Sequence, residues 1–189
     1  MSNGKLIARA LVGVVGGTPK IVRYHDNNET SNIDMYIGID RPEAGISTYS
    51  TIGLSNHSIG MKTDDGKQLR VEFIGACGSN ADQFANIISS CAFNIINSKY
   101  SCEPGVVYPC VVKEYYRDTD MEHIFFTTPF LWENLNDMVF DEMVVTWLTA
   151  IPISDNEFIY LKENGSEALE DLFEENNIDI FDITRKSLL

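Results

Sequence analysis

The amino-acid sequence predicts an α/β (α+β) fold, in which helices pack on a mixed β-sheet. Three observations predict this class. Strand-like segments alternate with segments of helical periodicity, several neighbouring strand segments are separated by turns short enough for hairpins, and a long amphipathic helix lies near the middle of the chain. Since the sequence contains no repeat and no linker, residues 1–189 are expected to form a single domain.

The N-terminal third is expected to begin with a helix from Lys5 to Val15. Its apolar residues recur at helical spacing, and Gly16-Gly17 provides the stop signal that follows many helices. Polar turns then separate segments of strand composition. The expected strands cover Lys20–His25, Ile33–Ile39 and Ser47–Leu54.

A further strand is expected around residues 69–73. Leu69, Val71 and Phe73 alternate with Arg70 and Glu72, which is typical of a strand with one covered face.

The clearest helix is expected from Asn80 to Lys99, with Asn80 and Gln83 as a capping pair. Its apolar residues follow the spacing of one helical face. They are Phe84, Ile87, Ile88, Cys91 and Ile95.

The C-terminal part is expected to contain two apolar strands followed by two helices. The strands cover His123–Thr128 and Val144–Ile153. Ser154 with Glu157 forms a capping box that opens a helix, and Gly165 ends it before a second helix over Glu167–Glu175.

The composition restricts the class of partner. The 189 residues include 14 basic and 28 acidic side chains, a net charge of −14, while 44% are apolar, which is too many for a disordered chain. Such acidity argues against binding to nucleic acid or to an anionic membrane, because both carry negative charge. A protein partner with a basic surface is compatible with it.

The remaining composition predicts a cytoplasmic protein without cofactor or metal. The sequence shows no signal peptide and no apolar run long enough to span a membrane. The four cysteines lack the C-x-x-C spacing of zinc sites, so they are expected to be reduced structural thiols. They are Cys77, Cys91, Cys102 and Cys110.

The acidic residues are concentrated in one part of the chain. Residues 118–182 contain 17 acids and one base, Lys162, a net charge of −16. One interpretation is a solvated acidic face, and the other is a surface that meets a basic partner. On the second interpretation, acids mixed with aromatic residues are the predicted partner-binding residues. These are Asp118, Asp120, Glu122, Trp132, Glu133, Asp137, Phe140, Asp141 and Glu142.

Candidates for catalysis are weak. Gly53-Leu54-Ser55-Asn56-His57 lacks the second glycine of the hydrolase G-x-S-x-G turn, and strand-end residues that satisfy a turn are the simpler interpretation. Asp118-x-Asp120-x-Glu122-His123 lacks the glycine and distal glutamate of a calcium-binding loop. No set of nucleophile, base and oxyanion donors is visible, so we predict no catalytic residues.

Two blocks of sequence resemble suppressor-of-fused-like domains. The first, Thr48–His57 (TYSTIGLSNH), resembles the signature strand and turn of that family. The second resembles the C-terminal part of its short bacterial form. It comprises Ile151–Glu157, Lys162, Gly165 and Ile180–Ser187, including Asp182 and Arg185-Lys186-Ser187.

The resemblance implies an α/β sandwich around a mixed sheet and a function in binding protein. Bacterial members of this size resemble immunity proteins, or antitoxins, of polymorphic (LXG-type) toxin systems, in which the toxin often carries a nuclease domain. We therefore expect a non-enzymatic inhibitor whose acidic surface covers the basic active-site region of a cognate toxin. The alternatives are a non-catalytic interaction or scaffold module with another partner, and a small hydrolase that uses Ser55 and His57.

Overall fold

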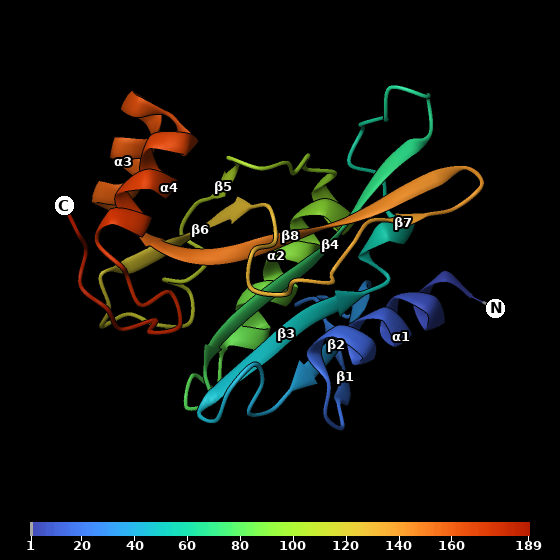
Figure 1. The fold of residues 1–189 in the computed structure, drawn as a ribbon, viewed down its shortest axis with the longest axis horizontal. Coiled ribbons are helices and arrows are strands. Elements are labelled where there is room, and N and C mark those ends of the chain that lie inside the picture. Colours follow the sequence, from blue (N-terminus) through green and yellow to red (C-terminus); the bar gives the residue numbers. More distant parts are fainter. Residues whose placement is uncertain (1) are drawn as a thin grey trace.

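The computed structural model describes residues 2–189, which form an eight-stranded mixed sheet with helices on both faces (Figure 1). The strand order is β1-β2-β3-β4-β8-β6-β5, and β7 pairs with β8 beside this path. The pair β4·β8 is parallel, and the other pairs are antiparallel. The elements are α1 (Asn3–Val15), β1 (Lys20–His25), β2 (Asn32–Gly38), β3 (Ile46–Ile52), a 3-10 turn η1 (Leu54–Asn56), β4 (Gln68–Gly78), α2 (Phe84–Ser98), β5 (Val107–Tyr108), β6 (Met121–Thr127), β7 (Met138–Val139), β8 (Met143–Ser154), α3 (Asp155–Asn164) and α4 (Ser166–Glu175). The predicted mixed sheet with packed helices is confirmed.

Both faces of the central strand β4 are covered. Val71 and Phe73 belong to the core that α2 covers, whereas Ile74 and Ala76 belong to the core that α1 covers. Because successive strand residues point to opposite faces, α1 and α2 lie on opposite sides of the sheet (Figure 1).

The prediction that this strand has only one covered face is therefore wrong. Glu72 has no exposed surface at all, although its charge marked it as solvent-facing. The reason is that α1 and α2 pack on opposite faces of β4, and the buried carboxylate is stabilised by hydrogen bonds described below.

The helix termini follow the sequence signals to different degrees. The capping box of Ser154 and Glu157 is present, with each side chain bonded to the other's backbone N–H. The predicted capping pair of Asn80 and Gln83 is not formed. Helix α2 begins only at Phe84, since the preceding residues 79–83 form a turn whose backbone is hydrogen-bonded to distant residues, Ser79 N to Gly45 O and Gln83 N to Tyr116 Oη.

The C-terminal segment, residues 177–189, joins all three hydrophobic clusters found within residues 2–189. Ile183 is buried in the α2-side core, and Phe181 packs against the α1-side core. Ile178, Ile180 and Leu188 pack against the third cluster, which α3 and α4 form over β6 and β8. This segment thus fastens the two C-terminal helices to the rest of the sheet.

A buried ion pair holds the end of this segment. Arg185 Nη1 and Nη2 donate to the two carboxylate oxygens of Glu157 at 2.6 and 2.7 Å. The Glu157 side chain is fully buried and that of Arg185 is 8% exposed, so each charge depends on the other. The capping box and the ion pair share Glu157, which couples the start of α3 to the C-terminal segment.

We predict that Arg185→Ala lowers the free energy of unfolding by about 3–5 kcal/mol, because it leaves the Glu157 carboxylate buried without its counter-charge. Urea denaturation measures the loss. Lys186→Ala is the matched control, since its side chain is 86% exposed and its ion pair with Asp120 lies on the surface. Equal losses in the two variants would contradict the predicted role of the buried pair.

Candidate functional site

The nine predicted partner-binding residues lie in two separate groups. Asp118, Asp120 and Glu122 lie at the start of β6, whose Met121 pairs with Ser154 at the end of β8. The other six lie in the segment 132–142, which leads through β7 to the start of β8, where Val139 pairs with Val144. Ten residues of β8 separate these pairing points, about 33 Å of extended chain. The structure therefore does not bring the nine residues into one patch.

The first group is engaged within the protein. Asp120 accepts hydrogen bonds from Ser187 N at 3.2 Å and from Lys186 Nζ at 3.4 Å, and the first of these is the main cause of its lowered pKa. Glu122 accepts from Lys113 Nζ at 2.6 Å. Two of its three acids thus help to hold neighbouring segments in place.

The second group combines exposed acids with buried aromatic residues. Glu133, Asp137, Asp141 and Glu142 are exposed. Trp132, one of the two aromatic residues predicted to contact the partner, is 6% exposed and packs in the α1-side core, so it supports the segment from beneath. Phe140 is half-buried against the same core.

The buried carboxylate of Glu72 organises the segment that carries the suppressor-of-fused resemblance. Thr51 Oγ1 donates to it at 2.6 Å and Ser55 Oγ at 2.8 Å. The backbone N–H groups of Gly53, Leu54 and Ser55 donate at 2.9, 3.2 and 3.1 Å. Burial raises the pKa of Glu72, and these hydrogen bonds act in the opposite direction. Five donors thus wrap the end of β3 and the 3-10 turn around one side chain.

Gly53 allows the backbone to make this turn. Its φ of +100° lies in the left-handed region that glycine adopts without steric cost. A Cβ atom there would also meet Asn56 Nδ2 at 3.3 Å.

The same geometry does not favour catalysis by Ser55. The residue is 1% exposed and its hydroxyl donates to Glu72, so its oxygen does not face solvent as a nucleophile would. The structural interpretation of this motif explains every hydrogen bond that the turn makes to Glu72.

A Cys-His-Asp constellation that the sequence analysis missed is also unsuited to catalysis. His123 Nδ1 accepts a hydrogen bond from the backbone N of Cys110 at 2.8 Å, so the ring proton lies on Nε2, 3.3 Å from Asp155 Oδ1. Both ring nitrogens are therefore engaged, and neither is left to activate the exposed Cys110 thiol. Within residues 2–189, no group of three or more His, Cys, Asp or Glu side chains is arranged to hold a metal ion.

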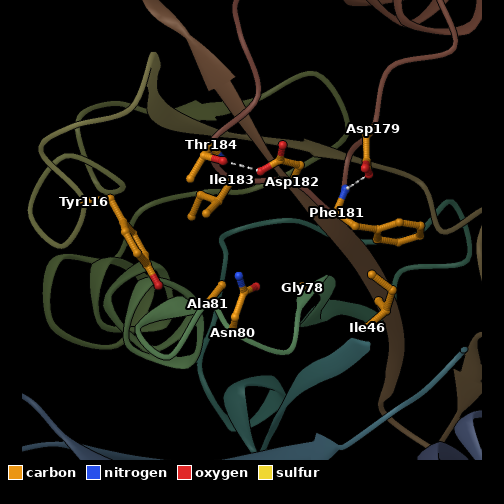
Figure 2. A pocket seen from close by; sticks show the side chains of 10 residues that line it. All are labelled: Ile46, Gly78, Asn80, Ala81, Tyr116, Asp179, Phe181, Asp182, Ile183 and Thr184. Atoms are coloured by element: carbon orange, nitrogen blue, oxygen red, sulfur yellow. Dashed lines mark hydrogen bonds between the residues drawn. The ribbon is translucent and has the colours of Figure 1, made fainter. Parts of the chain in front are cut away.

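Two neighbouring hollows flank the C-terminal segment. The first, of about 390 Å³, lies between that segment and the turn before α2, with Tyr116 at one side (Figure 2). Asp179 Oδ1 accepts from Phe181 N, and Asp182 Oδ1 accepts from the backbone and hydroxyl of Thr184, so Oδ2 of neither carboxylate is used in its own turn. The wall of this hollow that the C-terminal segment forms is therefore acidic.

The second hollow, of about 600 Å³, is mainly apolar. Phe173 and Ile151 are buried beneath it, Phe130 stands at its edge with 56% of its surface exposed, and Glu174 adds an exposed carboxylate. Phe181 lines both hollows, which are thus adjacent. Sequence reasoning missed this region because its walls come from residues about 50 to 100 positions apart. The one local signal is the Asp182-x-Thr184 spacing of an Asx turn.

Comparison with known proteins decides the family. The sequence profile described as "Suppressor of fused protein (SUFU)" matches residues 29–186. The chain belongs to the suppressor-of-fused family. This confirms the resemblance stated from residues 48–57 and the C-terminal block.

Two further kinds of match agree with this suppressor-of-fused assignment. The chain is 47% identical over 186 residues to "Immunity protein YqcF" of Bacillus subtilis (strain 168), covering 98% of this chain and 96% of the relative. A putative suppressor-of-fused homologue from Neisseria gonorrhoeae has the same fold, with a TM-score of 0.73, 17% identity, and coverage of 98% of this chain and 96% of that one. A chain of the Sufu–Fu complex matches with a TM-score of 0.67 and 11% identity, over 97% of this chain and 91% of that one.

We predict that Glu72→Gln lowers the free energy of unfolding by about 3 kcal/mol, because an amide N–H₂ group would face hydrogen-bond donors in place of an acceptor. Denaturant titration gives the value. Glu122→Gln, the same substitution at a partly exposed ion pair, is expected to cost less than about 1 kcal/mol. If the two variants lose similar stability, the organising role assigned to Glu72 is wrong.

Proposed function

We propose that this protein is the immunity protein of a toxin–immunity pair and that it neutralises its cognate toxin by binding it in the cytoplasm of the producing cell. One observation carries the proposal: the relative named an immunity protein is 47% identical and aligned over nearly the whole of both chains. Identity at this level over full length supports a shared mode of action as well as a shared fold.

The charge distribution supports a nuclease as the target. A nuclease presents a basic groove to phosphates, and an acidic protein surface can cover such a groove. The net charge of −16 over residues 118–182 supplies the complementary sign. Complementary charge accelerates encounter and disfavours wrong partners.

Of the nine predicted contact residues, we propose that the exposed acids of segment 132–142 contribute most. Glu133, Asp137, Asp141 and Glu142 lie on one continuous segment and are exposed. Asp120 and Glu122 already accept hydrogen bonds from neighbouring segments, so their charge is less available to a partner.

In this proposal the protein inhibits the toxin by binding alone and catalyses no reaction. The Glu72 cluster and the His123 contacts both support structural roles for the residues that resemble catalytic sets. An interaction module with a partner other than a toxin is the second candidate, favoured by the solved complex of Sufu with Fu in the same fold.

We expect co-expression with the toxic domain encoded beside this protein to restore growth of a bacterial host, and the two proteins to purify as a complex, because immunity here acts by binding. Ser55→Ala is expected to rescue equally well, since Ser55 serves the turn. Loss of rescue in a folded Ser55→Ala protein would favour the hydrolase alternative. Failure of the wild-type protein to rescue or bind, with both proteins folded, would leave only the fold and family assignments.

Reversal of Asp137, Asp141 and Glu142 to lysine is expected to slow association with the toxin about tenfold and to flatten its salt dependence, because rim charges act mainly on encounter. Stopped-flow or surface-binding kinetics at two salt concentrations measure both effects. The control carries the same charge change at Glu29, Glu103 and Glu114, which are exposed and lie outside the acidic region. Equal kinetics in the two triple variants would refute the assignment of this acidic segment.

A further inference from the structure

We propose that the two hollows on either side of Phe181 form the docking surface for a toxin segment that carries an apolar side chain next to a lysine or arginine. This inference rests on the proposed immunity function and specifies where and what the protein binds. The sequence analysis placed neither hollow in an interface.

The second hollow provides the place for the apolar side chain. Its volume of about 600 Å³ falls in the range of about 300–1,000 Å³ found for ligand-sized pockets. Phe130 exposes 56% of its surface at the edge, over the buried residues Ile151 and Phe173. A solvent-exposed aromatic side chain beside an apolar hollow with a polar rim is typical of an interaction site.

The charges around this surface specify a basic neighbour for that side chain. Glu174 is exposed on the rim of the second hollow. Across Phe181, Asp179 and Asp182 line the first hollow, and Oδ2 of each carboxylate takes no part in its own turn (Figure 2). A guanidinium or ammonium group in the first hollow would therefore meet two carboxylate oxygens.

The same charges argue against other occupants. A symmetric dimer through this surface would place Glu174, Asp179 and Asp182 near their own copies, where like charges repel. Nucleic acid and anionic membranes are repelled for the same reason. A basic segment of a protein is the occupant that complements both the apolar hollow and its acidic neighbour.

The surface is also continuous with the acidic segment proposed above. Phe130 and Leu131 line the second hollow and are followed directly by Trp132 and Glu133. A toxin anchored at Phe130 therefore lies beside the exposed acids of segment 132–142. The hollows supply the apolar anchor that the buried Trp132 does not.

Two single variants test the surface in the purified full-length protein with the toxic domain. Phe130→Ser is expected to raise Kd by at least about tenfold, mainly through faster dissociation, because it removes the anchor. Glu174→Lys is expected to slow association several-fold and to reduce its salt dependence. Both side chains are exposed, so thermal unfolding is expected to remain close to that of the wild type.

Matched controls carry the same kinds of change elsewhere. Ile21→Ser removes an apolar side chain that is 49% exposed on β1, and Glu29→Lys reverses an exposed acid in the turn between β1 and β2. Both are expected to bind the toxin within twofold of the wild type.

The possible outcomes separate this inference from the proposed function. If the wild-type protein binds the toxin but Phe130→Ser and Glu174→Lys behave like the controls, the docking surface is wrong and the immunity function stands. If Phe130→Ser instead dissociates a dimer of this chain and leaves toxin affinity unchanged, the surface is a self-association site and the inference is overturned. If the wild-type protein binds no toxin, both proposals fail.

Discussion

The buried carboxylate of Glu72 is the constraint on which the centre of the fold depends. A charged group inside a sheet is tolerated only where donors replace the water it has lost. Here the donors come from the end of β3 and the turn that follows it, so the carboxylate fixes the path of the chain as well as its own position. Thr51, Gly53 and Ser55, which donate to Glu72, lie within the block 48–57 that resembles the family.

Repulsion between like charges in the acidic half of the chain is a second electrostatic constraint on the fold. Residues 118–182 repel one another through a net charge of −16, which disfavours the compact state. The structure opposes this with contacts from the end of the chain: Arg185 pairs with Glu157, and Ser187 N and Lys186 bind Asp120. Two of the few basic residues in this half thus neutralise acids that hold the fold, while Glu133, Asp137, Asp141 and Glu142 remain exposed.

Local patterns predicted much of the fold, and long-range contacts account for the misses. The limits of β1 and the capping box at Ser154 were predicted because neighbouring residues determine them. The burial of Glu72 was missed because its five donors lie 17 to 21 positions away, and the alternation of β4 is that of a half-exposed strand. The turn that delays the start of α2 is held by hydrogen bonds to Gly45 and Tyr116, which lie outside any local sequence window.

The sign of the charge at the candidate site could be predicted from the sequence, but the position of the site could not. The acidic window was visible in the sequence, whereas its division between the two ends of β8 follows from strand pairing. Trp132 and Phe140 were predicted as the aromatic contact residues, but a residue type alone does not reveal which face of a loop packs inward. Phe130, two positions before Trp132, has the exposure that this role requires.

The C-terminal segment has a consequence for the order in which the protein is made. Residues 177–189 complete three hydrophobic clusters and supply walls of both hollows, so contacts of high sequence separation form after the strands have been synthesised. A nascent chain that stops before residue 177 retains every strand and helix of the sequence but lacks the segment that joins them. The hollows on either side of Phe181 therefore form only in chains whose translation has passed this point.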